Sequence, residues 1–253
     1  SAANGGGIHI SAGSVVTFGT VSIAGNTATT GDGGGIWTAE SLTIGNNIAI
    51  TSNSAANGLG GGIYAAGNGV TITLDGTVIG GSVAEANSAK SGGGVALTAG
   101  ASLLMLNASV ITYNTAVDGG GVYASADSTL NLTSGSISNN TATGNGGGIW
   151  TATSVTIDSG LTLANNTAQA GYGGAIYGGG SAAITLDGAT VGGSAAATNS
   201  AKFGGGVALA DTAALTLLNS AVISHNTATD GGGIYASAGT GLTLTSGRVT
   251  NNA

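Results

Sequence analysis

Aliphatic and polar residues alternate in short runs along the whole chain. In segments 42–44, 130–132 and 242–244 an aliphatic residue stands on each side of Thr or Asn, and this period of two is typical of a half-buried β-strand. Similar runs are centred on Ile23, Ile137, Leu163 and Val249. Gly, Thr and Val are frequent and no apolar stripe has the 3.6-residue period of a helix, which disfavours helical repeats. The pattern predicts an all-β chain.

A glycine run followed by Ile or Val divides the chain into repeats of 27 to 32 residues. The motif places its aliphatic residue at Ile8, Ile36, Ile63, Val95, Val122, Ile149, Ile176, Val207 and Ile234. Before each later glycine run stands Asn, then Ser or Thr, then Ala. These triplets begin at Asn26, Asn53, Asn87, Asn114, Asn140, Asn166, Asn199 and Asn226. Such a period indicates a solenoid, whose units cannot bury their apolar faces alone.

We predict a right-handed parallel β-helix of nine coils, each with about three short strands and the turns between them. At about 4.8 Å per coil, the rod would be roughly 40 to 45 Å long. The inward positions of two of the coils are Leu42, Ile44 and Ile50, and Leu130, Leu132 and Ile137. The triplet asparagines fall at one turn of successive coils, where their amides can stack as a ladder. Asn also tolerates left-handed turn geometry, and both roles are compatible.

The sequence also repeats over a period longer than one coil. Residues 36–39, Ile-Trp-Thr-Ala, are repeated at residues 149–152, and this alignment continues along the chain. We therefore expect one solenoid over residues 1–253, with a four-coil unit at 36–148, a second at 149–253, and 1–35 as the end of a preceding unit. The chain begins within a triplet, which indicates a segment of a longer array.

Charged residues are scarce and mainly acidic. Three Lys and Arg stand against ten Asp and Glu, which gives a net charge of −7. Without a basic stripe, nucleic acid and anionic lipid surfaces are disfavoured as partners. There is no apolar run of about 18 residues that would insert into a membrane. Cysteine is absent, which excludes thiolate metal sites. His9 and His225 lie about eight coils apart, so they cannot bind one metal ion together or serve one reaction.

The carboxylates are not spaced as an active site requires. Asp32, Asp118 and Asp230 share one turn position but lie three and four coils apart, about 14 and 19 Å at the β-sheet spacing. A glycosidase needs its carboxylate pair within roughly 10 Å. Asp75 and Asp187 are also four coils apart. We therefore expect no enzyme activity, no cofactor and no metal, with a polysaccharide-active enzyme as a minor alternative.

One outward file of the alternating strand is rich in threonine. It reads Thr17, Thr43, Thr73, Leu104, Asn131, Thr156, Thr185, Thr216 and Thr243. An ice-binding face would need a second, parallel file of threonines, but the neighbouring positions are mainly Gly, Asp and Leu. The β-propensity of threonine accounts for the single file, so ice binding is a second minor alternative.

The residue after each glycine-Ile motif is aromatic in most coils. This file reads His9, Trp37, Tyr64, Ala96, Tyr123, Trp150, Tyr177, Ala208 and Tyr235. If the preceding aliphatic residue points inward, strand alternation turns the rings outward, where they form a contact surface for a glycan or another rod. Ring stacking that only shields the strands is an equal alternative. Leu97 and Leu209 follow the two alanines, so the two positions could also compete for one space.

Gly173-Gly174-Ala175-Ile176 and the Ile-x-x-Asn segments at 23–26, 111–114, 137–140 and 223–226 resemble the Gly-Gly-Ala-Ile and Phe-x-x-Asn repeats of the polymorphic outer-membrane autotransporter family. The resemblance implies adhesion and surface display, at a prokaryotic cell surface or outside the cell. We therefore expect a structural, non-catalytic rod of an adhesin-like repeat protein. The alternative is a subunit of an extracellular fibre, assembled by end-to-end or lateral packing, because open strand edges pair with other chains. The expected partner is another copy of the chain for the fibre, and a cell-surface or glycan ligand for the adhesin.

Overall fold

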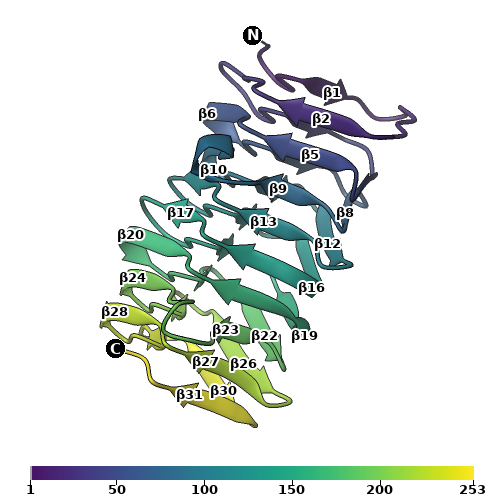
Figure 1. Ribbon diagram of the computed structural model, residues 1–253. Coiled ribbons are helices and arrows are strands. Elements are labelled where there is room, and N and C mark those ends of the chain that lie inside the picture. The colour runs from purple at the N-terminus through teal and green to yellow at the C-terminus, as the bar shows by residue number, and fades with distance from the viewer. Residues whose placement is uncertain (1) are drawn as a thin grey trace.

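The computed structural model describes residues 2–253 as a rod of nine stacked coils (Figure 1). Its strands lie one above another from the N-terminal to the C-terminal end, and the pairings between the named strands are parallel. The parallel β-helix and the nine coils predicted from the repeats are confirmed.

The strands form three sheets along the rod. The first sheet has one strand per coil: β1 (Ile8–Ile10), β3 (Ile36–Thr38), β7 (Ile63–Ala66), β11 (Val95–Thr98), β15 (Val122–Ala124), β18 (Ile149–Thr151), β21 (Ile176–Gly178), β25 (Val207–Leu209) and β29 (Ile234–Ala236). The second contains β2 (Val21–Ala24), β4 (Leu42–Gly45), β5 (Ile48–Thr51), β8 (Thr71–Asp75), β9 (Val78–Gly80), β12 (Ser102–Leu106), β13 (Val110–Thr112), β16 (Thr129–Ser138), β19 (Val155–Ala164), β22 (Ala183–Asp187), β23 (Thr190–Gly192), β26 (Ala214–Leu218), β27 (Ala221–Ser224), β30 (Gly241–Leu244) and β31 (Gly247–Thr250). The third contains β6 (Ser54–Leu59), β10 (Ser88–Ser91), β14 (Thr115–Ala116), β17 (Thr141–Ala142), β20 (Thr167–Tyr172), β24 (Ser200–Phe203) and β28 (Thr227–Asp230).

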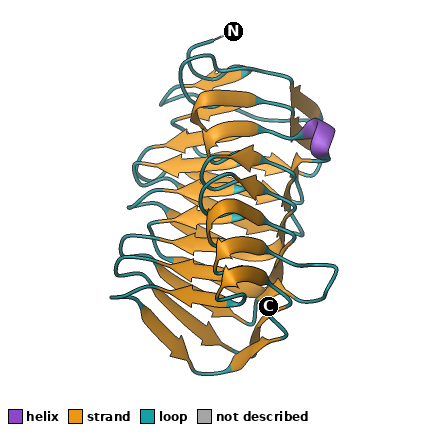
Figure 2. Ribbon diagram, turned by 90° about the vertical axis from the view of Figure 1, so that its left-hand side faces the viewer, coloured by secondary structure: helices purple, strands orange, loops and turns teal. Residues whose placement is uncertain are grey.

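The third sheet contains the Ser/Thr-Ala part of the triplets, which the alternating pattern did not predict as a strand. The longer coils accommodate their extra residues in loops outside the stack, one of which contains the 3₁₀ helix η1 (Val83–Glu85), purple in Figure 2. Within residues 2–253, no helix is long and apolar enough to cross a membrane.

Strand alternation creates a single aliphatic core along the rod. The predicted inward residues Leu42, Ile44, Ile50, Leu130, Leu132 and Ile137 are at most 4% exposed. They belong to one buried cluster that extends from Ile10 to Ile223. In the first sheet, the residues before and after each ring are both inward-facing, as Ile36 and Thr38 are around Trp37. Leu97 and Leu209 likewise face the core, so they do not compete with the rings for space.

The asparagine ladder predicted from the triplets is present. The Nδ2 of each Asn donates to the Oδ1 of the Asn in the next coil at 2.8–3.1 Å, from Asn26 to Asn252. The same Oδ1 accepts the backbone N–H of the preceding Asn at 2.9–3.4 Å. From Asn53 onward, Nδ2 also donates its second hydrogen to a carbonyl one coil back, which is that of Ile111 for Asn140. Every buried amide of the ladder is therefore paired both along the rod and with the backbone.

The glycine turn has two distinct steric requirements. Its first glycine has a left-handed backbone, with φ of +62° at Gly119, which favours a residue without a Cβ. Its second glycine, such as Gly120, lies against the next coil, because a Cβ there would be 2.5 Å from the carbonyl oxygen of Gly147. The third glycine is less constrained, since Ala175 occupies that position in one coil.

Gly120→Ala should therefore destabilise the rod by about 1 to 3 kcal/mol, the usual cost of overpacking. Gly121→Ala is the matched control, and we expect a smaller cost because the equivalent Ala175 is native. Thermal denaturation followed by circular dichroism would compare the two variants. Equal losses of stability would show that the close approach at Gly120 is not the limiting contact.

Candidate interaction surface

The aromatic file, called the ring file from here on, lies on the outer face of the first sheet. Trp37, Tyr64, Tyr123, Trp150, Tyr177 and Tyr235 are each partly exposed. Rings in adjacent coils stack on one another: the His9 and Trp37 centroids are 4.2 Å apart at an interplanar angle of 4°, and those of Tyr123 and Trp150 are 4.5 Å apart at 15°. The file is thus both stacked and partly accessible, and its role as a contact surface stays a prediction.

Two alanines interrupt the ring file, and neighbouring rings cover them. Ala96 is fully buried although it faces outward in register with Tyr64 and Tyr123. The Tyr64 hydroxyl is 2.8 Å from Thr98 Oγ1 on the next strand, so the Tyr64 ring lies over this alanine. The tilt of the Tyr64 ring along the rod thus covers the gap that Ala96 leaves in the ring file.

A second file lies five residues before the ring file, at the corner that precedes each glycine turn. This corner file reads Asn4, Asp32, Leu59, Ser91, Asp118, Asn145, Tyr172, Phe203 and Asp230. It touches the ring file, because the Tyr172 and Tyr177 centroids are 6.3 Å apart and those of Phe203 and Tyr235 are 5.1 Å apart. Tyr172 and Phe203 thereby widen the aromatic surface around Ala208, and the sequence analysis did not include them.

The polar members of the corner file bind the backbone of the next coil. Asp32 Oδ1 accepts the N–H of Leu59 at 2.8 Å, and Asp118 Oδ1 accepts the N–H of Asn145 at 2.9 Å. Asn145 Oδ1 in turn accepts the N–H of Tyr172 at 3.0 Å. An Asn and an Asp therefore perform the same structural role in this file, but only the Asp adds a negative charge beside the rings.

A row of acidic residues also lies on the other side of the ring file. Glu40, Asp127 and Asp211 follow the first-sheet strands β3, β15 and β25 by two or three residues. Asp211 Oδ2 accepts the N–H of Gly180 at 2.8 Å, and Glu40 Oε1 accepts the N–H of Gly13. The rings therefore lie between two rows of carboxylates.

Burial raises the pKa of Tyr64, Tyr123 and Tyr177 above the usual value of 10.0. The nearby carboxylates that increase the pKa further are Asp32 for Tyr64, Asp118 for Tyr123, and Asp211 followed by Asp118 for Tyr177. The hydrogen bond to Thr98 has the opposite effect on Tyr64. Because a negative charge on a phenol is disfavoured by nearby carboxylates, these shifts indicate that the acidic rows act on the rings.

Because the folded state raises these pKa values, their contribution to stability is fully present below about pH 10 and is lost as the pH rises above it. We expect the melting temperature to fall above that pH. The variant Tyr64→Phe/Tyr123→Phe/Tyr177→Phe should show a shallower fall, since it cannot ionise at these positions. Circular dichroism melts across the alkaline range would measure both, and identical pH profiles would contradict the assignment.

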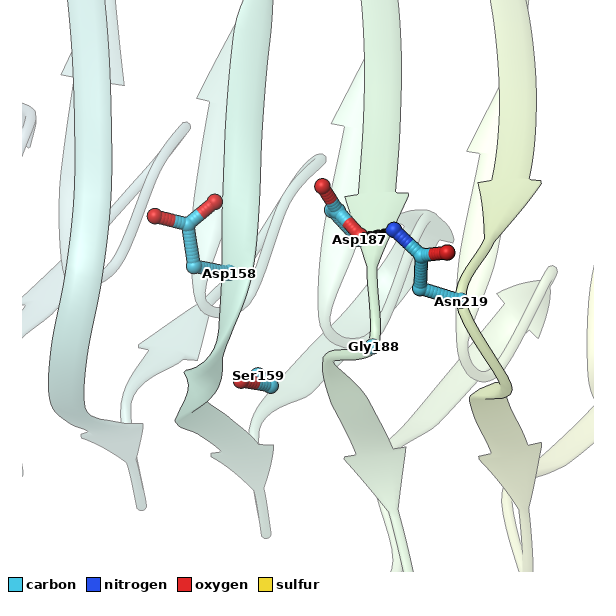
Figure 3. A pocket seen from close by; sticks show the side chains of 5 residues that line it. All are labelled: Asp158, Ser159, Asp187, Gly188 and Asn219. Atoms are coloured by element: carbon cyan, nitrogen blue, oxygen red, sulfur yellow. Dashed lines mark hydrogen bonds between the residues drawn. The ribbon is translucent and has the colours of Figure 1, made fainter.

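One carboxylate pair on adjacent coils was missed by the sequence analysis. Asp158 and Asp187 are in register on neighbouring strands, in a pocket lined also by Ser159, Gly188 and Asn219 (Figure 3). Asn219 Nδ2 donates to Asp187 Oδ1 at 2.5 Å. The lining contains no Lys, Arg or His, and residues 2–253 contain no group of three or more His, Cys, Asp or Glu that could hold a metal ion. The longer period of the sequence aligns Asp187 with Asp75, four coils away, whereas the stacking of single coils brings Asp158 beside it.

Nine parallel coils, an internal asparagine ladder and an outward ring file define a parallel β-helix repeat protein. Its repeats are similar to those of the Chlamydia polymorphic membrane proteins, because residues 134–152, 160–179 and 220–237 match the family model of that repeat. Each matched segment spans a ladder Asn, a glycine turn and a ring of the ring file, such as Asn140 and Trp150 in the first. Comparisons with curated proteins and with solved structures give no match.

Proposed function

We propose that the chain is a non-catalytic structural rod of an adhesin-like repeat protein, secreted or displayed at a prokaryotic cell surface, with the ring file as its contact surface. The observation that carries the proposal is the row of partly exposed Trp and Tyr rings on a rigid β-helix. Rigid aromatic side chains supply a large contact area at low cost in conformational entropy. The match to a membrane-protein repeat family supports display at a surface.

Binding of the purified rod to prokaryotic and host cell surfaces, and to immobilised glycans, would test the proposal. Trp37→Ala/Trp150→Ala should reduce binding by about tenfold or more, as expected for truncated aromatic anchors. Tyr113→Asn is the control, because Tyr113 lies outside the ring file and Asn adopts the same left-handed backbone at the equivalent residue 139. Unchanged binding in the tryptophan variant would exclude the ring file as the contact surface.

Lateral association of rods into a fibre is the second candidate, since the same partly exposed rings could pack against those of another copy. Electron microscopy and sedimentation of the purified rod would separate the two. Side-by-side filaments that dissociate in the tryptophan variant would favour the fibre, whereas monomeric rods that still bind a surface would favour the adhesin.

A further inference from the structure

The ring file lies between two rows of carboxylates, and we infer that its partner is cationic, an arginine- or lysine-rich protein segment. This inference rests on the proposed function, because it specifies the partner for the same surface. Arg combines the two chemistries that the surface offers: its planar guanidinium stacks on aromatic faces, and its N–H groups bind carboxylates in a bidentate manner.

The acidic residues of the chain are concentrated beside the rings. Six of the ten Asp and Glu belong to the two rows: Asp32, Asp118 and Asp230 in the corner file, and Glu40, Asp127 and Asp211 on the other side. Lys90 and Lys202 each lie next to the corner file, and the Asp118 N–H donates to the Lys90 carbonyl at 3.3 Å. The six carboxylates of the two rows and these two lysines together give an excess of four negative charges. A field of one sign attracts and orients a partner of the opposite sign.

The carboxylates have acceptor capacity left for a ligand. The backbone hydrogen bonds of Asp32 and Asp118 use Oδ1, and the described part of the chain gives no partner for Oδ2 of either residue. Asp32 precedes Trp37 by five residues and Glu40 follows it by three, so carboxylates lie on both sides of the same ring. The faces of Trp37 pack against His9 and Tyr64, whereas Tyr123 stacks on Trp150 with one face and has Ala96 as its neighbour in the preceding coil. A guanidinium on that second face of Tyr123 would have Asp118 on one side and Asp127 on the other.

The surface already holds one cation on an aromatic face. Lys202 Nζ lies 5.1 Å from the centroid of Phe203, and Phe203 stacks on Tyr172 with centroids 4.7 Å apart. A second copy of the chain fits this surface poorly, because it offers three Lys and Arg against ten acidic residues. A neutral glycan could stack on the rings but would gain no charge attraction from the two rows.

The test is the affinity of the intact rod for nona-arginine, measured by calorimetry and by tryptophan emission, with nona-glutamate and a neutral oligosaccharide as comparison ligands. Nona-arginine should bind and should perturb the emission of Trp37 and Trp150. Its affinity should fall with added salt. The variant Asp32→Asn/Asp118→Asn/Asp230→Asn should bind it about tenfold more weakly, the loss expected from three partly exposed ion pairs. Its fold should be unchanged, because Asn145 makes the same hydrogen bond in the corner file.

The matched control is Asp75→Asn/Asp158→Asn/Asp187→Asn, which removes the same charge on the second sheet, away from the rings. It should bind nona-arginine almost as well as the native rod does. Equal weakening of both variants, or tighter binding of the neutral ligand, would overturn the inference. If the tryptophan variant alone loses cell-surface binding and the aspartate variants do not, the inference fails and the proposed function stands. If nona-arginine binds at the rings but no cell surface does, the inference stands and the proposed function fails.

Discussion

Asn140→Leu is expected to lower the free energy of unfolding by about 4 kcal/mol, because several buried groups lose their partners at roughly 1 to 3 kcal/mol each. The backbone N–H and the Nδ2 of Asn114 donate to Asn140 Oδ1 at 2.9 and 3.1 Å, and the Ile111 carbonyl accepts from Asn140 Nδ2 at 2.9 Å. Leucine has a similar volume but offers none of these bonds. Hydrogen exchange should show opening concentrated in this coil and its neighbours, since each coil contacts only adjacent coils.

Asn131→Leu is the matched control for the ladder variant. It makes the same chemical change in the same coil, at an exposed position whose register partner in the preceding coil is the native Leu104. We expect a change within about 0.5 kcal/mol, as for most surface substitutions. Equal effects of the two substitutions would show that the ladder contributes no more than a surface residue does.

Ile137→Asp should be still more disruptive. Ile137 is fully buried in the core, and an unpaired carboxylate there costs several kcal/mol or forces the group to become protonated. The central coils should lose their native structure at temperatures where the unmodified rod is folded. Circular dichroism and limited proteolysis would detect the loss, with cleavage expected near this coil.

Ile137→Val provides the comparison, because Val191 and Val249 occupy equivalent positions in the same inward file. Its expected cost is about 0.5 to 1.5 kcal/mol. If Ile137→Asp retained the melting temperature of the valine variant, the inward assignment of this file would be wrong.

The features that could be predicted from the sequence depend only on the spacing of residues. Once the coil length is known from the recurrence of an aliphatic residue after each glycine run, residues at equivalent positions must stack, which places Ile137 inside and joins Asn140 to Asn166. The outward direction of the rings follows from strand alternation in the same way. The period was therefore sufficient to predict the coils, the residues of the core and the asparagine ladder.

Other contacts depend on geometry that spacing does not specify. The hydrogen bond from the Leu59 N–H to Asp32 Oδ1 requires the corner to turn that carboxylate toward the next coil. The covering of Ala96 by Tyr64 depends on the tilt of a ring along the rod. The two-residue strands at Thr115–Ala116 and Thr141–Ala142 are too short for an alternation pattern. The shared position of Asp32, Asp118 and Asp230 followed from the spacing, but their hydrogen bonds to the next coil and their place beside the rings became visible only in the structure.

The direction of the hydrogen bonds has a mechanical consequence. Bonds between coils run along the rod, so tension applied at its ends opens the bonds of an end coil before those of the coils behind it. Once an end coil unfolds, its chain becomes much longer than the part of the rod that it occupied. The coil from Val122 to Ile149 occupies about 4.8 Å of the rod, but its extended chain would span roughly 90 Å. Under tension, such a rod would lengthen coil by coil and absorb work while the remaining coils stay folded.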